Sequence, residues 1–119
     1  MHFRKEISKW GENLACEYLK SLNYEILERN FLFYEEKIDI IAKDLEKNEL
    51  VLIEVKTHSN FKYGNPSDET DNSKQNYIKK AINYYLCENH IKDISIRIDI
   101  IEVYIQINNY KINHIKETV

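Results

Sequence analysis

The sequence predicts an α/β fold in which a mixed β-sheet is flanked by helices, and three observations support this prediction. Apolar residues recur with helical spacing in two segments and gather into β-branched or aromatic runs in five others. These segments follow one another in the order α-β-β-β-α-β-β, which is typical of a sheet covered by helices. The chain of 119 residues contains only two glycines and one proline, so we expect long elements and few loops.

The first helix is expected from about Ile7 to Leu22. Large apolar side chains recur at helical spacing on one stripe of this segment: Ile7, Trp10, Leu14, Tyr18 and Leu22. On that stripe, Trp10 should pack into the core. Asn23 is expected to end the helix.

Three strands should follow in close succession. They are the segments 24–33 (YEILERNFLF), 37–42 (KIDIIA) and 50–57 (LVLIEVKT), which are rich in β-branched and aromatic residues. A polar turn at 43–49 separates the second from the third. Because the connections are short, we expect an antiparallel meander.

The second half of the chain should supply a helix and two further strands. Residues 58–72 contain the only Gly-x-Pro segment and are expected to form an irregular loop. A helix should begin at Asn72, where Gln75 completes a capping-box pattern. Its apolar stripe is formed by Tyr77, Ile78, Ala81, Ile82, Tyr85 and Leu86. Two strands are then expected, at 94–107 and at 111–117.

Composition limits the class of protein. The length suits a single domain spanning residues 1–119, and no apolar run approaches the roughly 18 residues of a membrane span. Cys16 and Cys87 lie far apart and the N-terminus lacks the apolar segment of a secretory signal, so we expect a cytoplasmic protein with reduced, packed thiols. The net charge of −3 argues mildly against general nucleic-acid binding but leaves room for a metal-bridged site.

The third predicted strand becomes charged at its end, where Glu54 and Lys56 share one face of the strand. If the second and third strands form a hairpin, Asp39 can lie across from Glu54. Two close carboxylates repel one another unless a cation lies between them, and hard oxygen ligands suit Mg²⁺ or Mn²⁺. Lys56 could then position a water molecule or stabilise charge on a phosphate. The alternative is an ordinary ion pair between Glu54 and Lys56, with Asp39 facing solvent.

A family resemblance is carried by five segments, in this order: GENLACEYLKSLNYEILERNF, KIDIIA, LVLIEVKT, YGNPSDETDNSKQ and IDIIEV. Over roughly residues 8–116 the chain resembles the YraN-like bacterial proteins, which are similar to the PD-(D/E)XK nuclease superfamily that includes archaeal Holliday-junction resolvases. The resemblance implies a restriction-endonuclease-like core. It places Asp39, Glu54 and Lys56 at the three core catalytic positions, the first two as metal ligands, and Glu12 at a further acidic position.

The resemblance also implies a function, namely Mg²⁺- or Mn²⁺-dependent endonucleolytic hydrolysis of DNA phosphodiester bonds. Branched or single-stranded DNA is the implied substrate, 5′-phosphate ends are the implied product, and a homodimer would serve two strands. The alternative is a non-catalytic module that retains the fold and binds nucleic acid or a protein. One departure supports the alternative, because Lys37 stands where the family usually has an acid.

Secondary candidates have ordinary explanations beside the functional ones. Lys74 and Gln75 open the second helix, where Lys74 could contact a phosphate but is more simply a solvated side chain. Lys74, with Lys79 and Lys80, makes a weak basic face on that helix. His58 follows the third strand and is expected to be exposed. His114 has no partner at ligand spacing.

Overall fold

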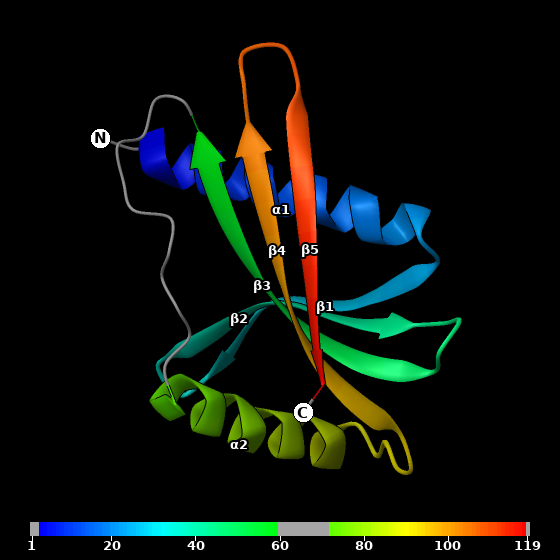
Figure 1. The fold of residues 1–119 in the computed structure, drawn as a ribbon. Coiled ribbons are helices and arrows are strands. Elements are labelled where there is room, and N and C mark those ends of the chain that lie inside the picture. Colours follow the sequence, from blue (N-terminus) through cyan, green and yellow to red (C-terminus); the bar gives the residue numbers. More distant parts are fainter. Residues whose placement is uncertain (1–2, 60–71, 119) are drawn as a thin grey trace.

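The computed structural model describes residues 3–59 and 72–118, which form a five-stranded sheet with one helix against each face (Figure 1). In chain order the elements are α1 (Phe3–Ser21), β1 (Tyr24–Phe33), β2 (Glu36–Asp44), β3 (Glu49–Ser59), α2 (Asn72–Glu88), β4 (Ser95–Ile105) and β5 (Tyr110–Thr118). The α/β class and the predicted element order are confirmed.

The sheet is mixed, with its strands in the order β1-β2-β3-β4-β5. The pairs β1–β2 and β2–β3 are antiparallel, so the first three strands form the predicted meander. Strands β3 and β4 are parallel, and β4–β5 is antiparallel. A parallel pair needs a crossover connection, and the segment containing α2 provides it. Most of the loop predicted at 58–72 lies outside the described residues. Its first two residues, 58 and 59, belong to β3, so the prediction of a loop is wrong there.

The two faces of the sheet carry separate hydrophobic clusters. The cluster beneath α1 is formed by Ala15, Cys16, Leu19, Tyr24, Ile40, Ala42, Val51, Ile53, Ile101, Val103 and Ile105. The cluster beneath α2 is formed by Ile38, Ile41, Leu50, Leu52, Ala81, Ile82 and Tyr85. Alternation along β3 explains the division, because successive side chains of a strand point to opposite faces. The central strands are therefore covered on both sides, as their apolar runs predicted.

The predicted packing stripe of α1 is wrong in part. Trp10 is 52% exposed and Leu22 also faces solvent. Ile7, Leu14 and Tyr18 of that stripe are partly buried against the cluster beneath α1, but the fully buried side of the helix is the neighbouring one, which includes Gly11, Ala15 and Leu19. A methyl group on Gly11 would lie only 2.7 and 2.9 Å from Cγ2 and Cβ of Thr57 on β3. Small residues thus let the helix approach the sheet closely, and the helix is rotated accordingly.

Other side-chain predictions divide between confirmed and wrong. Tyr85 is buried in the cluster beneath α2, as its place on the apolar stripe predicted, and the neighbouring Tyr84 is exposed. Cys16 is a buried, packed thiol, but Cys87 is exposed near the end of α2 and does not serve core packing. Neither α1 nor α2, the helices of the described residues, has the length and apolarity needed to cross a membrane.

Candidate active site

Asp39 lies on β2 at the point where that strand stops pairing with β3. The ladder between the two strands runs from Asp44↔Glu49 to Ile40↔Ile53. One position further on, Oδ2 of Asp39 accepts a hydrogen bond of 2.8 Å from the backbone N–H of Val55. The carboxylate is therefore held between the two strands, and its side chain is only 16% exposed. It does not face solvent freely, as the ordinary ion-pair alternative required.

The surroundings of Asp39 favour its protonated form. Burial is the main cause that raises the pKa of this carboxyl above its ordinary value, and the nearby charges of Glu12 and Glu54 raise it further. The hydrogen bond from Val55 and the charge of Lys37 act in the opposite direction. Three acidic groups from α1, β2 and β3 thus interact electrostatically, which is the situation that a bound cation would relieve.

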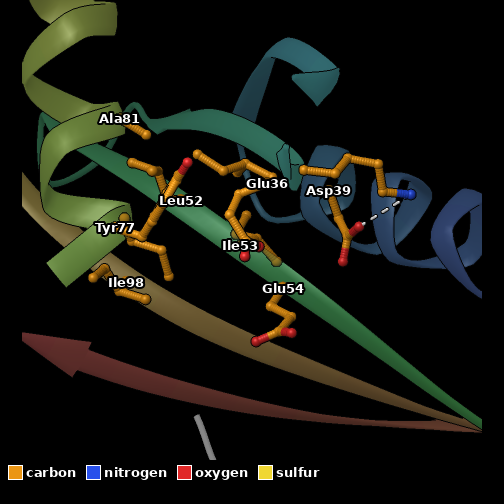
Figure 2. Close-up of a pocket in the computed structure, with 11 residues that line it drawn as sticks. Glu36, Asp39, Leu52, Ile53, Glu54, Tyr77, Ala81 and Ile98 are labelled. Atoms are coloured by element: carbon orange, nitrogen blue, oxygen red, sulfur yellow. Dashed lines mark ion pairs between the residues drawn. The ribbon is translucent and has the colours of Figure 1, made fainter. Parts of the chain in front are cut away.

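Glu54 lies on β3 and shares a pocket with Asp39 (Figure 2). The pocket lies between α2 and the strands β2, β3 and β4, and its described lining is Glu36, Lys37, Ile38, Asp39, Leu52, Ile53, Glu54, Tyr77, Ile78, Ala81 and Ile98. Glu54 is on the same face of β3 as Leu52, which packs toward α2. The partly buried Glu54 therefore lies in a largely apolar pocket with Asp39, close enough for its charge to act on that carboxyl.

Lys56 follows Glu54 by two residues on β3 and is partly buried. Strand alternation places it on the same face as Glu54, as the sequence predicted. It pairs in register with Glu102 on the parallel strand β4. Lys56 therefore shares a face of β3 with Glu54, but it is not part of the described lining of the pocket that holds Asp39 and Glu54.

Glu12 enters the site because of how α1 is rotated. It follows Gly11, whose contact with Thr57 fixes the helix against β3, and it is only 8% exposed. Its Oε1 lies 3.2 Å from Nη2 of Arg29 on β1, and the same nitrogen donates a hydrogen bond of 2.8 Å to Asn13. Arg29 was not a predicted site residue, and its position opposite the helix could not be read from the sequence.

Lys37 is the chain's own cation at Asp39. Its Nζ lies 3.5 Å from Oδ1 of Asp39, and its side chain is 48% exposed. The dashed line in Figure 2 marks this ion pair. Lys37 thus supplies positive charge to one of the two carboxylates that line the pocket.

The donor set suits a small divalent ion with few protein ligands. Among residues 3–59 and 72–118, no three His, Cys, Asp or Glu side chains are arranged as a metal-binding group. Mg²⁺ is commonly held by one or two carboxylates, with waters and substrate phosphates completing its shell. Asp39 and Glu54 meet that requirement, whereas a zinc site built from several His or Cys ligands is not present in this part of the chain.

The remaining predicted candidates are Lys74, Gln75 and His58, of which the structure describes only the side chain of His58. Lys74 and Gln75 lie in the first turn of α2, but their side chains lie outside the described residues. His58 belongs to β3 and turns toward β4, where its Nε2 lies 3.3 Å from Glu102 and its ring stacks on Tyr104. It is partly buried, so the prediction of an exposed loop histidine is wrong.

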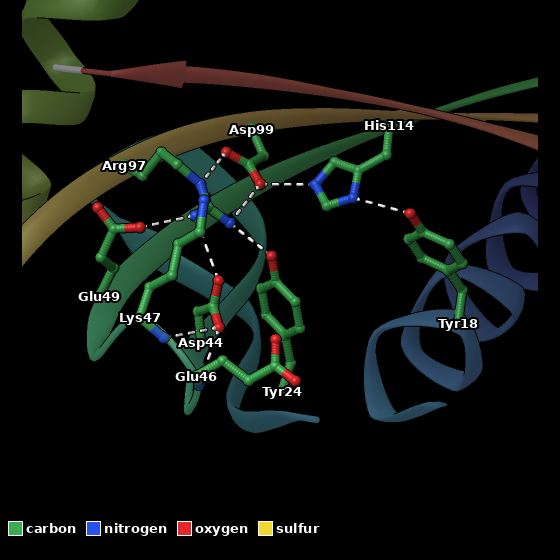
Figure 3. Close-up of polar contacts among 9 residues, drawn as sticks. All are labelled: Tyr18, Tyr24, Asp44, Glu46, Lys47, Glu49, Arg97, Asp99 and His114. Atoms are coloured by element: carbon green, nitrogen blue, oxygen red, sulfur yellow. Dashed lines mark hydrogen bonds and ion pairs between the residues drawn. The ribbon is translucent and has the colours of Figure 1, made fainter. Parts of the chain in front are cut away.

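Sequence reasoning missed a buried polar network on the α1 side of the sheet (Figure 3). Arg97 on β4 contacts Asp99, Asp44 and Glu49, and its Nη2 lies 2.5 Å from the hydroxyl of Tyr24. Asp99 is fully buried.

The network continues from Asp99 to α1 through a histidine. Nε2 of His114 lies 2.6 Å from Oδ2 of Asp99, and Nδ1 of His114 lies 3.0 Å from the hydroxyl of Tyr18. His114 therefore has partners, although none is at ligand spacing in the sequence. One feature of the sequence could have revealed this network. Arg97 and Asp99 alternate with isoleucines in β4, and a charged side chain on the core-facing side of a strand needs a partner that compensates its loss of hydration.

Comparison with known proteins gives one consistent result. Residues 11–103 match a family model described as uncharacterised protein family UPF0102. A UPF0102 protein of Flavobacterium psychrophilum is 40% identical over 112 residues, which cover 94% of this chain and 92% of the relative. A UPF0102 protein of Clostridium botulinum is 43% identical over 120 residues, covering 98% and 96%. A UPF0102 protein of Caldicellulosiruptor saccharolyticus is 39% identical over 106 residues, covering 89% and 88%. These names state a family and no activity.

Proposed function

The chain belongs to the UPF0102 family, as its resemblance to the YraN-like proteins predicted, and we propose that it is a Mg²⁺- or Mn²⁺-dependent nuclease that hydrolyses DNA phosphodiester bonds. The observation that carries the proposal is the shared pocket of Asp39 and Glu54, with Glu12 close enough to act on the charge of Asp39. The three acids come from three different elements, so the fold and not local sequence brings them together.

The residues divide into roles that follow from their positions. Asp39 and Glu54 would hold the ion, and a buried Glu12 would add to the negative potential that attracts it. When bound, such an ion lowers the pKa of a coordinated water and neutralises charge on a phosphate. Lys56, on the same face as Glu54, would orient the attacking water or stabilise the developing phosphate charge.

The substrate and assembly are part of the same proposal. Resemblance to the resolvases favours branched DNA, and single-stranded DNA is the other substrate that we would examine. Two copies of the chain would be needed to cut two strands, so the proposal includes a homodimer on such DNA. An enzyme that cuts bacterial DNA would meet its substrate in the cytoplasm, so the proposal includes a cytoplasmic location.

A second candidate function is a non-catalytic module that binds nucleic acid or a protein. The observation in its favour is the ion pair between Lys37 and Asp39, because a lysine at this distance supplies some of the positive charge that a metal would otherwise bring. Both candidates predict a stable fold, and they differ in whether the carboxylates bind a divalent ion.

The deciding experiment is a calorimetric titration with Mn²⁺ of the full chain and of Asp39→Asn, followed by incubation with labelled branched and single-stranded DNA. Asparagine is preferred to alanine because its side-chain oxygen can still accept the Val55 hydrogen bond, so the variant should fold. The matched control is Asp93→Asn, since Asp93 is an exposed residue with φ of 56° that asparagine also tolerates.

The nuclease proposal expects Mn²⁺ binding and cleavage in the wild type and in Asp93→Asn, with both lost in Asp39→Asn. Cleavage that continues in Asp39→Asn would reject the proposed site. A wild type that binds no Mn²⁺ and cuts neither DNA would reject the nuclease and leave the binding module as the better account.

A further inference from the structure

A second, wider hollow lies beside the candidate active site, between α1 and the β1–β2 hairpin. We refer to it as the cationic groove. Its described lining is Lys5, Ser8, Lys9 and Glu12 from α1, Arg29 and Asn30 from β1, and Lys37 from β2. The sequence did not indicate this surface, because its residues come from three elements and the predicted basic face was on α2.

The groove concentrates positive charge on a chain whose net charge is −3. Its described lining carries four cationic side chains and one carboxylate, and that carboxylate, on Glu12, is already paired with Arg29 at 3.2 Å. Lys5 and Lys9 are exposed and stand four residues apart, so they share one side of α1 at a rise of about 6 Å. Like charges so placed repel one another, and an anion between them would relieve the repulsion.

The groove and the pocket of the candidate active site, which holds Asp39 and Glu54, have Lys37 in common. Glu12 lines the groove and also acts on the charge of Asp39. A polyanion lying along the groove would therefore reach Lys37, whose Nζ lies 3.5 Å from Oδ1 of Asp39.

The uncharged lining suits the same ligand. Ser8 and Asn30 are exposed side chains that can donate hydrogen bonds, as such side chains commonly do to phosphate oxygens. Among the described residues, the groove is lined by cations, a hydroxyl and an amide, which offer contacts to a sugar–phosphate backbone, and by no aromatic side chain on which a base could stack. Its recognition should therefore depend on charge more than on base sequence.

We infer that the cationic groove binds the backbone phosphates of a nucleic-acid strand and leads that strand to Asp39 and Glu54. The inference rests on the proposed function, because it names how the substrate of that site is held. It assigns phosphate contacts to Lys5 and Lys9, which are distant in sequence from the carboxylates and are not part of the proposed metal site.

The test measures binding of labelled single-stranded and branched DNA to the full chain in EDTA, where no metal-dependent cleavage occurs. The test variant is Lys5→Glu/Lys9→Glu. The matched control is Lys20→Glu/Lys92→Glu, which makes the same charge change at two exposed positions, one in the last turn of α1 and one after α2, that line neither the groove nor the pocket of Asp39. Thermal unfolding followed by circular dichroism checks that both variants fold.

The groove variant should bind single-stranded DNA at least tenfold more weakly, and its slope of log K against log salt should be shallower by about 1.4, as expected for two lost phosphate contacts. The control should change affinity less than twofold. Equal weakening in both variants, an unchanged groove variant, or a wild type that binds no DNA would each overturn the inference.

The result can be separated from the fate of the nuclease proposal. Metal-free binding that depends on Lys5 and Lys9 would support the groove even if no DNA were cut. Conversely, Asp39-dependent cleavage that is unaffected by Lys5→Glu/Lys9→Glu would support the nuclease and reject the groove.

Discussion

Lys37, the residue that departs from the family pattern, acts directly on Asp39 because the two side chains form an ion pair. Its ammonium lies 3.5 Å from Oδ1 of Asp39 and is about half exposed. An ion pair that is so open to solvent contributes about 0–1 kcal/mol, so it competes with a divalent ion but does not exclude one. The substitution of an acid by Lys37 therefore weakens the proposed metal site without abolishing it.

We expect Lys37→Met to raise the affinity for Mn²⁺ by about two- to fivefold, because the ion no longer has to break the pair with Asp39. Lys37→Glu should raise it further, since it restores an acid on the same face of β2. Calorimetric titration at constant pH measures both effects.

The matched control for this prediction is Lys43→Met, which removes a lysine from the same strand inside the β2–β3 ladder, where Lys43 pairs with Leu50. Its Mn²⁺ affinity should equal that of the wild type. An affinity that falls in Lys37→Met would show that the lysine supports the site and does not compete with the metal.

At the scale of single elements, the position of α1 depends on the contact between Gly11 and Thr57. Glycine in a helix interior usually costs about 0.5–1 kcal/mol relative to alanine, so Gly11→Ala would be stabilising if nothing packed against this position of the helix. Here the added methyl group would meet Cγ2 and Cβ of Thr57 at 2.7 and 2.9 Å. Overpacking of this kind usually costs about 1–3 kcal/mol, which outweighs the gain in helix propensity.

We therefore expect Gly11→Ala to lower the free energy of unfolding, as measured by urea titration at pH 7. Thr57→Ala removes Cγ2 and the hydroxyl but keeps Cβ, so the double variant should recover part of the loss. If Gly11→Ala raised the free energy of unfolding, or if the change in the double variant equalled the sum of the two single changes, this contact would not be what holds α1 in place.

The same contact explains which features of α1 the sequence could predict. Helical spacing predicted the existence of the helix and its end, and Asn23, with φ of 68°, lies two residues after its last residue, Ser21. The spacing of large side chains placed Trp10 in the core, because bulky apolar residues usually mark the buried face. The true face is set by a close approach between Gly11 and a residue 46 positions later, which no local pattern records. Glu12 is buried as a consequence.

The strands were easier to predict than the site. β1 has the predicted bounds, because a run of β-branched and aromatic residues is a local signal. The hairpin of β2 and β3 placed Asp39 near Glu54, and the two residues line one pocket. The hydrogen bond from Val55 to Asp39 depends on where the ladder ends, which is decided by the twist of the sheet and not by either strand alone.

At the scale of the whole molecule, the network around Arg97 connects elements that are far apart in sequence. Through its partners and theirs it joins β4 to α1, β1, β5 and the β2–β3 turn (Figure 3). Removing one partner of a buried, hydrogen-bonded charge costs more than the pair itself contributes. The network lies on the α1 side of the sheet and lines neither the pocket of Asp39 nor the cationic groove. We therefore assign it to stability.

Asp44 makes the stability of this network dependent on pH. Burial by itself would raise the pKa of this carboxyl, but hydrogen bonds from the backbone N–H of Lys47, from Arg97 and from the N–H of Glu46 together bring the pKa below its ordinary value of 3.8. The folded state thus binds a proton less readily than the unfolded state. The contribution of ionised Asp44 is fully present above pH 3.8 and is lost as the pH falls through the lower pKa of the folded state.

We expect Asp44→Asn to lower the free energy of unfolding at pH 7 by about 1.5–3 kcal/mol, the usual contribution of a hydrogen bond to a charged group. The asparagine oxygen can still accept the hydrogen bonds from Glu46 and Lys47, so the loss reports the ion pair with Arg97. Urea titrations at pH 7, 5 and 3 should show the same difference from wild type at the two higher values and a smaller one at pH 3. Glu46→Gln, an exposed change in the same turn, should show little difference at any pH. A difference for Asp44→Asn that stays constant down to pH 3 would mean that the network depends on the shape of this side chain and not on its charge.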